Sequence, residues 1–506
     1  MSFLAFLRGL AAALTLGLCF PAWAGETQVV MTGTLHAGDN QTYRELPFTV
    51  PAGVGKITVD VSWDSLEKGT YLVLGLYDPE RNRGWGGAIK PHFVVADGFA
   101  SPSYLPGPIV PGQWRLSLAV ASIRPGVTSP YTVKITLATG PEAQRFSDTP
   151  LRTGAGWYRG DLHSHTGHSD AACRSLSGAA TPCPLFLSLQ AAVDHKLDFL
   201  VVTDHNVSSH VADMGNLAAY FDTLLLIPGR EMTTQNGHFN LLGITDFVDF
   251  RLGPKGIPTI NGMFDAAKGT GALVSINHPE IPTGEACLGC GWNAPDTDYG
   301  RVQSVEVANG GIAADQGGFD DGAGSGVAFW EAQLSRGYHL TGVGGSDNHD
   351  AVDGRKDISP VGAQSPVGFP ATVVHADALS QPAILNGIRS GRVFIDLEGA
   401  HPGRVLDMAA SAGGATAVMG ATLARDAAAP IVAHIHVAGA KGAHIDLIAD
   451  GQGQKLIRDP VLRDDDQTVD VTFPAGQDIH WFRADVRAAD GRRILIGNPI
   501  YVAPKG

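Results

Sequence analysis

Two short motifs, far apart in the chain, are built from residue types that bind metal ions. They occupy residues 160–170 and 345–349. Their candidate ligands are His163, His165, Asp170, Asp347 and His349. Imidazole and carboxylate groups hold Zn, Mn or Fe while leaving one position of the ion open for water. A cluster this dense is difficult to explain by packing alone, so we expect it to determine what the protein does.

Four segments between these motifs carry more groups of the same kind. They contain Asp204, His205, Glu231, His238 and His278. Because these candidates outnumber what one ion can use, two or three divalent ions are expected as cofactors. Glu231 is the expected bridge, since a carboxylate can lend one oxygen to each of two ions. A water shared between such ions acts as hydroxide near neutral pH, which is the chemistry of a hydrolase.

The elements that must position these groups lie in the stretch 155–398, where apolar strands alternate with helical segments. Strands are predicted at 199–202, 224–227, 273–276, 302–307 and 340–343, and helices at 189–196, 260–268, 326–336 and 381–390. Repeated strand-then-helix units indicate a parallel barrel or a doubly wound sheet. Most candidate ligands follow directly after a strand. Barrels gather their active sites at those strand ends, so a barrel is favoured.

Local spacing refines this arrangement. His163 and His165 are two residues apart on one strand and therefore point the same way, and Asp347 and His349 repeat the pattern. His238 instead precedes an apolar run, so we expect it on a hairpin that returns to the site. Glu306 also ends a strand; a satisfied carboxylate of the barrel is favoured there over a residue of the pocket.

Stretches rich in β-structure flank the central part. In 26–148, apolar residues alternate with polar ones, as at Ile57, Val59 and Val61, and Gly and Pro clusters separate the runs. This pattern is typical of a β-sandwich. The same alternation between turns predicts a second sandwich at 405–506. A chain of 506 residues is too long for one hydrophobic core, which agrees with several domains.

Charge limits the range of partners. The chain has 36 Lys and Arg against 50 Asp and Glu, a net charge of -14, and no run of basic residues that would follow a phosphate backbone. Long nucleic acid is therefore not expected as a partner. A small anionic substrate remains compatible, because bound metal ions would dominate the local field. The sequence makes no prediction of the oligomeric state.

The first residues have the pattern of an export signal at 1–24. Arg8 supplies the positive start, Leu10 to Phe20 the apolar stretch, and residues 22–24 a small-residue cleavage site. The apolar run is too short for a membrane span, and no later segment is long and apolar enough for one. The mature protein is therefore expected to be periplasmic or secreted.

Four cysteines remain after the signal: Cys173, Cys183, Cys287 and Cys290. An even number in an oxidising compartment favours two disulfide bonds, most simply between sequence neighbours. A four-cysteine zinc site is the alternative. Residues 287–290 also match a redox dithiol, but no helix pattern starts there to lower the pKa of a thiol, so a loop staple is favoured.

Taken together, the motifs resemble those of the polymerase-and-histidinol-phosphatase (PHP) superfamily of metallohydrolases, in the same order along the chain. The similar stretch is 155–398, roughly half of the chain, and the joint set of motifs is highly specific. Within that superfamily, residues 203–206 and 228–231, together with the β-rich flanks, resemble the exported CehA/McbA-type branch. The resemblance implies a distorted barrel of seven β/α units and a site for three ions.

The resemblance also divides the candidate ligands among the ions by position. The first ion would be held by His163, His165, Glu231 and Asp347. The second would be held by Glu231, His238 and His278. The third would be held by Asp170, His205 and His349. Asp170 lies one residue short of the place where some relatives have histidine, which leaves the identity of the third ion open.

These features predict an exported metal-dependent hydrolase with a small-molecule ester as substrate. A phosphoesterase is the leading activity, because multinuclear sites suit displacement at phosphorus. Glu231 and Asp347 are expected at the reacting centre, with Arg230 and His210 as candidate clamps for substrate charge. One alternative is a carboxylic ester or carbamate hydrolase, in which the hydroxide attacks a carbonyl. The other is a binding protein that holds its metals without turnover.

Overall fold

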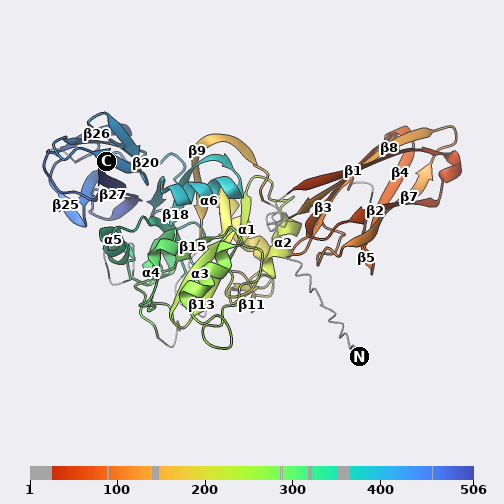
Figure 1. Cartoon of the computed structure of the whole chain (residues 1–506), viewed down its shortest axis with the longest axis horizontal. Coiled ribbons are helices and arrows are strands. Elements are labelled where there is room, and N and C mark those ends of the chain that lie inside the picture. Colours follow the sequence, from red (N-terminus) through yellow and green to blue (C-terminus); the bar gives the residue numbers. More distant parts are fainter. Residues whose placement is uncertain are drawn as a thin grey trace, which may run out of the picture.

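The computed structural model describes most of the chain. The described residues are 25–87, 90–139, 147–284, 287, 289–316, 322, 324–351, 364–399, 401–457 and 460–505. The export signal expected at 1–24 lies outside them. Strands dominate over helices in a mixed α/β structure, and Figure 1 shows its three parts in a row. No helix in these residues is long and apolar enough to cross a membrane.

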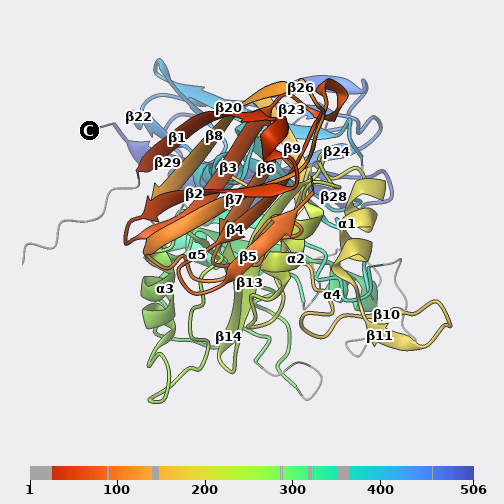
Figure 2. The same cartoon turned by 90° about the vertical axis from the view of Figure 1, so that its right-hand side faces the viewer.

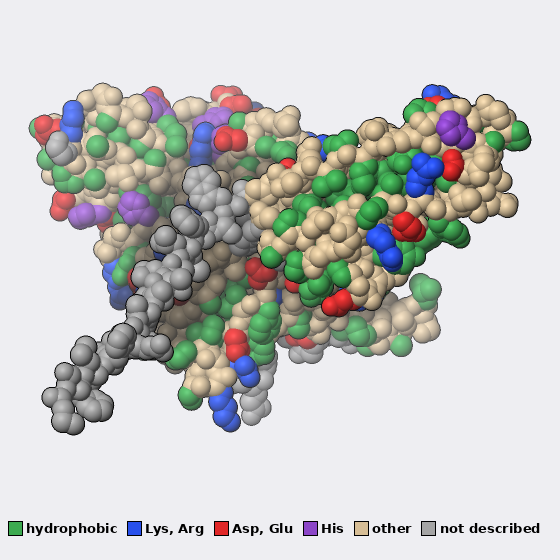
Figure 3. All heavy atoms as spheres, turned by 45° about the vertical axis from the view of Figure 1, so that its right-hand side comes forward, with side chains coloured by type: hydrophobic (Ala, Val, Ile, Leu, Met, Phe, Trp, Pro, Cys, Tyr) green, Lys and Arg blue, Asp and Glu red, His purple; other side chains and the backbone are tan. Residues whose placement is uncertain are grey.

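The N-terminal part consists of two antiparallel sheets of four strands each. One has the order β1 (Glu26–His36), β8 (Thr128–Thr139), β3 (Val54–Trp63) and β6 (His92–Ala96). The other has the order β2 (Thr42–Val50), β7 (Gly112–Ile123), β4 (Thr70–Tyr77) and β5 (Asn82–Gly86). The alternating residues Ile57, Val59 and Val61 face the core between the sheets. Figures 1 and 3 show this sandwich as a lobe that projects from the rest, and Figure 2 views it end-on, in front of the other parts.

The central part is one curved sheet that carries the candidate ligands at one edge. Its strands are β9 (Arg152–Asp161), β12 (Phe199–Val202), β13 (Leu225–Thr234), β14 (Gly237–Leu242), β15 (Leu273–Ile276), β16 (Ser304–Asn309), β17 (Thr341–Gly345), β18 (Ala371–Leu379) and β19 (Val393–Asp396). The spatial order is β17-β16-β15-β14-β13-β12-β9-β18-β19. Strands β9, β12, β13, β15, β16 and β17 share one direction, with the antiparallel β14 between them. Six carboxyl ends therefore meet at one edge.

Short helices cover this sheet. They are α1 (Leu185–Asp194), α2 (His210–Leu217), α3 (Ile260–Lys268), α4 (Gly310–Gln316), α5 (Val327–Ser335) and α6 (Gln381–Ser390). A small hairpin, β10 (Ala172–Arg174) and β11 (Ala180–Pro182), precedes α1. The seven-unit β/α barrel that the resemblance implies is not shown. Strand β14 follows β13 in a tight hairpin with no helix between, and β18 runs antiparallel to β9.

The sheet curls until its edge strand β17 reaches the other side. The backbone N–H of Gly344 donates to Thr372 Oγ1 of β18 at 2.8 Å, and that hydroxyl donates back to the carbonyl of Gly344 at 2.7 Å. Asn498 does the same for Gly342 through its side-chain amide. Beyond the strands, Ser164 after β9 forms a bridge with Asn348 after β17. The two motifs of the sequence are therefore adjacent in space.

Some of the C-terminal strands extend the central sheet, and the others form a sheet of their own. The C-terminal strands are β20 (Val405–Ala412), β21 (Ala415–Val418), β22 (Thr422–Arg425), β23 (Ile431–Ala438), β24 (His444–Ala449), β25 (Gln452–Gln454), β26 (Asp466–Phe473), β27 (Trp481–Arg487), β28 (Arg493–Gly497) and β29 (Ile500–Pro504). Strands β21-β20-β23-β26 form a separate sheet. Strand β28 pairs with β19 from Phe394 to Asp396, so the other C-terminal strands continue the central sheet. The domain boundaries expected from the sequence stay predictions.

Candidate metal centre

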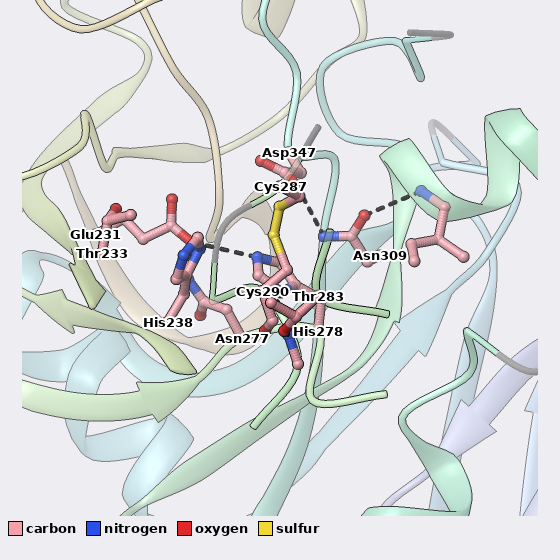
Figure 4. Close-up of a disulfide and its surroundings, with 12 residues drawn as sticks. Glu231, Thr233, His238, Asn277, His278, Thr283, Cys287, Cys290, Asn309 and Asp347 are labelled. Carbon is pink, nitrogen blue, oxygen red and sulfur yellow. Dashed lines mark hydrogen bonds and ion pairs between the residues drawn. A yellow bond between two sulfur atoms is a disulfide. The ribbon is translucent and has the colours of Figure 1, made fainter. Parts of the chain in front are cut away.

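The nine candidate ligands lie together at the carboxyl edge of the central sheet. His163 and His165 follow β9, Asp170 lies in the loop after them, His205 follows β12, Glu231 is in β13, His238 in β14, His278 follows β15, and Asp347 and His349 follow β17. Their donor atoms form overlapping groups, within each of which the atoms lie within 4.8 Å of one another. Figure 4 shows how closely Glu231, His238, His278 and Asp347 approach.

A buried carboxylate fixes the ends of β9 and β17. Asp161 Oδ1 accepts hydrogen bonds from the backbone N–H groups of His163 (3.1 Å) and Ser346 (2.9 Å), and Oδ2 accepts one from Gly368 (2.8 Å). Burial raises the pKa of Asp161, although these hydrogen bonds oppose the shift. The side chain of Asp161 therefore holds the two histidine-rich segments, which follow β9 and β17, side by side.

Two candidate ligands have strained backbones. The φ angle is 26° at His278 and 52° at Asp347, in the left-handed region that residues with a Cβ seldom adopt. Such conformations cost roughly 1–3 kcal/mol each and persist where the surrounding contacts force them, often at functional sites. At both positions the chain turns sharply after a strand, and the side chain points back toward the cluster.

The carboxylate of Glu231 lies between two sets of imidazoles. Its Oε2 is 3.4 Å from His163 Nε2 and 2.8 Å from His205 Nδ1. Its Oε1 is 3.3 Å from both His238 Nδ1 and His278 Nε2. Each oxygen therefore faces a different group of nitrogen donors. This is the geometry that a carboxylate shared between two cations requires.

Asp347 completes the set on the Oε2 side of Glu231. Its Oδ1 lies 3.2 Å from His163 Nε2 and 3.0 Å from His165 Nε2. Asn309 donates to the other oxygen, Oδ2, at 3.2 Å. Oδ1 of Asp347 thus faces the cluster, while Asn309, which is not a candidate ligand, holds Oδ2.

The third set of donors lies nearer the surface. His349 Nε2 and His205 Nε2 are 3.5 Å and 3.7 Å from Asp170 Oδ1. The ring of His165 stacks against both imidazoles, with centroids 4.0 Å from His349 and 4.3 Å from His205. The side chain of Asp170 is 43% exposed, so this end of the cluster opens to solvent.

The donor atoms fit bound cations. Buried atoms of the cluster without a hydrogen-bond partner are His163 Nε2, His165 Nδ1, Glu231 Oε2 and His349 Nε2. A buried polar group left unpaired costs about 1–3 kcal/mol, so a concentration of them at one place requires an explanation. Divalent ions would satisfy His163 Nε2, Glu231 Oε2 and His349 Nε2, and the mixture of imidazole and carboxylate donors suits Zn, Mn or Fe.

The charges in the cluster are coupled. Burial alone would raise the pKa of Glu231, but His163 and His205 hold it well below its usual value. Conversely, burial alone would lower the pKa of His163, and Asp347, Glu306 and Glu231 outweigh it, so that this pKa lies well above the usual value. Glu231 keeps its negative charge in the interior, which favours the binding of positive ions.

Several residues that are not candidate ligands hydrogen-bond to the ligands and fix their orientation. Glu306 Oε1 is 3.0 Å from His163 Nδ1, and its Oε2 accepts hydrogen bonds from the backbone of His278 and from Asn309. Thr233 Oγ1 lies 2.6 Å from His205 Nδ1. Partners of this kind fix the orientation of a ligating imidazole. Glu306 is a satisfied carboxylate, as expected, and it also orients a ligand. It lies inside β16, which continues to Asn309, and not at the strand end that the sequence indicated.

Arg230 and His210 do not join the cluster. Neighbouring residues of a strand face opposite sides, so Arg230 points away from the site that Glu231 faces. Its Nε donates to the carbonyl of Val207, its guanidinium lies over the ring of Phe247, and burial lowers its pKa to about 10. His210 is fully buried, with Nε2 3.0 Å from the carbonyl of Gly229, and burial lowers its pKa to about 4. Neither side chain is turned toward the donor atoms.

Asp204 organises the loop that carries Asp170. It accepts hydrogen bonds from the backbone and hydroxyl of Thr166 and from Ser169 Oγ at 2.6–2.8 Å. In the same loop, His168 turns outward to Ser209 and Asp213. A pocket of about 430 Å³ opens beside it, and its lining residues are Gly167, His168, Pro182, Cys183, Pro184, Leu185, Phe186, Asp213, Asn216 and Leu217. This pocket is largely apolar, and its lining residues Gly167 and His168 belong to the loop that carries Asp170.

Comparison with known proteins gave little. No model of a protein family matches the chain, and no curated protein matches it. Among solved structures, one match is a two-domain protein from Bacteroides vulgatus, described as containing a predicted PHP-like metal-dependent phosphoesterase. The TM-score is 0.35 with 19% sequence identity, over 70% of this chain and 98% of the other. At this TM-score the two folds superimpose only loosely, and the chemistry of this chain is inferred from its own residues.

Proposed function

We propose that the protein is a metal-dependent hydrolase of ester bonds, with phosphoric esters as the leading substrates. The observation that carries the proposal is the carboxylate of Glu231. Its Oε2 faces His163 and His165, and its Oε1 faces His238 and His278. A site for a single ion does not need a carboxylate whose two oxygens face different imidazoles. A centre of two or three divalent ions requires it.

The residues would divide into three groups around these ions, as the resemblance to the PHP superfamily implies. His163, His165 and Asp347 would complete the set on one side of Glu231, and His238 and His278 the set on the other. Asp170, His205 and His349 would hold a third ion at the exposed end. Bound ions of this kind lower the pKa of water toward 7 and polarise an ester oxygen. Glu306, Asn309 and Thr233 would keep the ligands oriented.

Phosphoric esters are favoured because several cations at short spacing can neutralise the charge of a phosphoryl group. The apolar pocket beside His168 favours the second candidate, a carboxylic ester or carbamate hydrolase. Phe186, Leu185 and Pro184 line it, and they could accept an aryl leaving group. Arg230, buried against Phe247, gives no support to a phosphate clamp. In a phosphoesterase, the metal ions themselves would therefore supply the positive charge that a phosphate group needs.

We further propose that the protein is exported, as the first 24 residues indicate. Both cysteine pairs, Cys173–Cys183 and Cys287–Cys290, lie at disulfide distance. Disulfide bonds form and persist in oxidising compartments, so this pairing is compatible with a periplasmic or secreted protein.

The test is a substrate panel on the purified protein with its metals. We expect hydrolysis of nitrophenyl phosphate or bis-nitrophenyl phosphate to exceed that of a naphthyl carbamate, and removal of metal by a chelator to abolish it. The reverse preference would favour the second candidate. Absence of metal-dependent turnover on the whole panel would favour a binding protein and contradict the hydrolase.

Glu231→Gln is the decisive variant. Because the amide has only one oxygen and no charge, we expect it to lose bound metal and to reduce turnover by at least about 100-fold. The matched control is Glu280→Gln, which makes the same change at an exposed glutamate two residues beyond His278. Elemental analysis and the substrate panel should leave this control unchanged. Full activity in Glu231→Gln would contradict the proposal.

A further inference from the structure

A disulfide bond lies against one half of the metal centre. Cys290, which is bonded to Cys287, is fully buried. Its Sγ and one ring nitrogen each of His238 and His278 lie within 4.8 Å of one another. Figure 4 shows the disulfide beside His278, with His238 and Glu231 next to it. A disulfide bond that only closes a loop does not need to lie beside the metal centre, because a position at the surface would close the loop equally well.

The backbone around Cys290 is held by contacts that do not depend on the disulfide. The N–H of Trp292 donates to the carbonyl of Pro279, and that of Asn293 to the carbonyl of Asn236 in the β13–β14 turn. Gly289 has a φ of 77°, and a Cβ added to it would lie 2.1 Å from the carbonyl oxygen of Thr234. The loop is thus pressed onto the hairpin, and Cys290 would remain near the two histidines after the sulfur–sulfur bond breaks.

Cys290 also touches His278 through its backbone. Its carbonyl oxygen is 3.3 Å from His278 Nδ1, while Nε2 of the same ring faces Glu231. A ring N–H donated to a carbonyl fixes which nitrogen of the imidazole is free to bind a cation. The same residue therefore orients one donor of this half of the centre and keeps a sulfur beside it.

We propose that Cys290 is a fourth donor of the half-site formed by Glu231, His238 and His278, and that its bond to Cys287 keeps this donor masked. The inference rests on the proposed function and makes the ligand set of the second ion depend on the oxidation state of the cysteine pair. With the disulfide formed, the half-site offers three protein donors and an open position, as catalytic sites do. With the disulfide reduced, four donors would close it, as in structural zinc sites.

A small dithiol can reduce the disulfide between Cys287 and Cys290. The sulfur–sulfur bond of Cys287 and Cys290 breaks, and each sulfur gains one electron and one proton. The dithiol loses two electrons and two protons and closes into a cyclic disulfide. When Cys290 then binds a cation, its proton passes to solvent. Because thiolate is a soft ligand, the reduced half-site should select zinc over manganese.

The experiment uses the full chain loaded with Co²⁺, whose absorption reports its ligands. We compare the wild type before and after a dithiol with Cys287→Ser and Cys290→Ser. Both variants lose the same disulfide, so any general effect of opening the loop is matched between them. Cys287→Ser leaves a free thiol beside His238 and His278, and Cys290→Ser removes it. Competition with a zinc indicator measures affinity in each case.

The proposal predicts a thiolate-to-cobalt charge-transfer band in reduced wild type and in Cys287→Ser without reductant. Oxidised wild type and Cys290→Ser should lack the band. In the two proteins with the band, the Kd for zinc at this half-site should fall by on the order of 100-fold. Cobalt bound without any thiolate band in reduced wild type and Cys287→Ser would overturn this inference and leave the proposed function standing. No binding of cobalt by the oxidised protein would overturn both.

Discussion

The carboxylate of Glu306 holds two of the groups that would bind the ions. One oxygen is 3.0 Å from His163 Nδ1, and the other accepts the backbone N–H of His278. Through these two contacts it links a donor on each side of Glu231. Partners of this kind make an imidazole a better ligand and fix its ring, so their removal weakens metal binding without deleting a ligand.

We therefore expect Glu306→Gln to weaken metal binding by roughly 10–100-fold while the fold is kept. The amide oxygen can still accept one hydrogen bond, but the negative charge facing His163 is lost. Titration of metal-free protein with zinc, alongside a thermal melt, separates the two effects. Unchanged affinity would mean that Glu306 only packs against the site.

The pKa values of the metal-free protein predict how binding depends on pH. Burial alone would lower the pKa of His205, but Glu231 raises it to about 9, and the pKa of His278 is raised as well. At pH 7 the ring of His205 therefore carries a proton in the metal-free protein, and a cation binds only neutral imidazole. Binding should therefore release protons, and the apparent affinity should increase from pH 7 to about 9.

Isothermal titration in two buffers of different ionisation enthalpy measures this release directly. A heat of binding that is the same in both buffers, together with an affinity independent of pH over that range, would contradict the expected coupling.

Local spacing predicted which residues come together, and tertiary contacts decided the rest. His163 and His165 both turn toward Asp347, as their spacing predicted, although they lie just beyond the end of β9. The same rule of alternation excludes Arg230, because it is the neighbour of Glu231 on β13 and must face the other side. The place of Cys290 beside His238 was not predictable, because it depends on how the loop after His278 packs onto a distant hairpin.

At the scale of elements, β17 is held in place by side chains as well as by strand pairing. On the side away from β16, Asn498 exchanges two hydrogen bonds with Gly342 and donates a third to the carbonyl of Val393. The Asn498 side chain is buried, so nothing replaces these bonds when it is removed. Because β17 leads into Asp347, this contact also positions a proposed ligand.

Asn498→Ala should lower the free energy of unfolding by about 2–4 kcal/mol, since buried backbone groups would be left unpaired. Urea denaturation provides the measurement. Asn386→Ala, on the exposed side of α6, is the matched control and should change it by less than about 0.5 kcal/mol. Equal stability of the two variants would show that β17 does not depend on this asparagine.

The sequence predicted parallel strands in the central part and a returning hairpin at His238, but not that β18 runs antiparallel to β9. The hairpin expected at His238 is present, because β14 pairs antiparallel with β13 across the short Gln235–Asn236 turn. The pairing of β19 with β28 joins residues about a hundred positions apart in the chain. No local pattern encodes such a contact, and this is why the continuity of the sheet was not anticipated.

At the scale of the molecule, the two flanking parts differ in how they are attached. Among the residues that the structure describes, the N-terminal sheets share no strand pairing with the central sheet, and Phe99 meets Gly215 of α2 where the two parts touch. The C-terminal strands instead continue the central sheet, and the buried side chains of Arg159 and Asp396 form an ion pair that Arg404 joins.

Truncation should therefore have opposite results at the two ends. Deletion of residues 1–147 should leave a soluble protein that still binds metal, because the central sheet keeps all its partners. Deletion of 405–506 should prevent folding, because it exposes the edge of β19 and much of a shared core. Circular dichroism and metal analysis of both fragments provide the test. A folded, metal-binding protein without its C-terminal strands would contradict this view.

The most direct test of the metal centre is anomalous diffraction from a crystal of the protein grown with its metals. The structure predicts two or three ions at the carboxyl edge of the central sheet, with Oε1 and Oε2 of Glu231 on different ions. Anomalous peaks elsewhere, or a Glu231 that contacts no ion, would contradict the central claim.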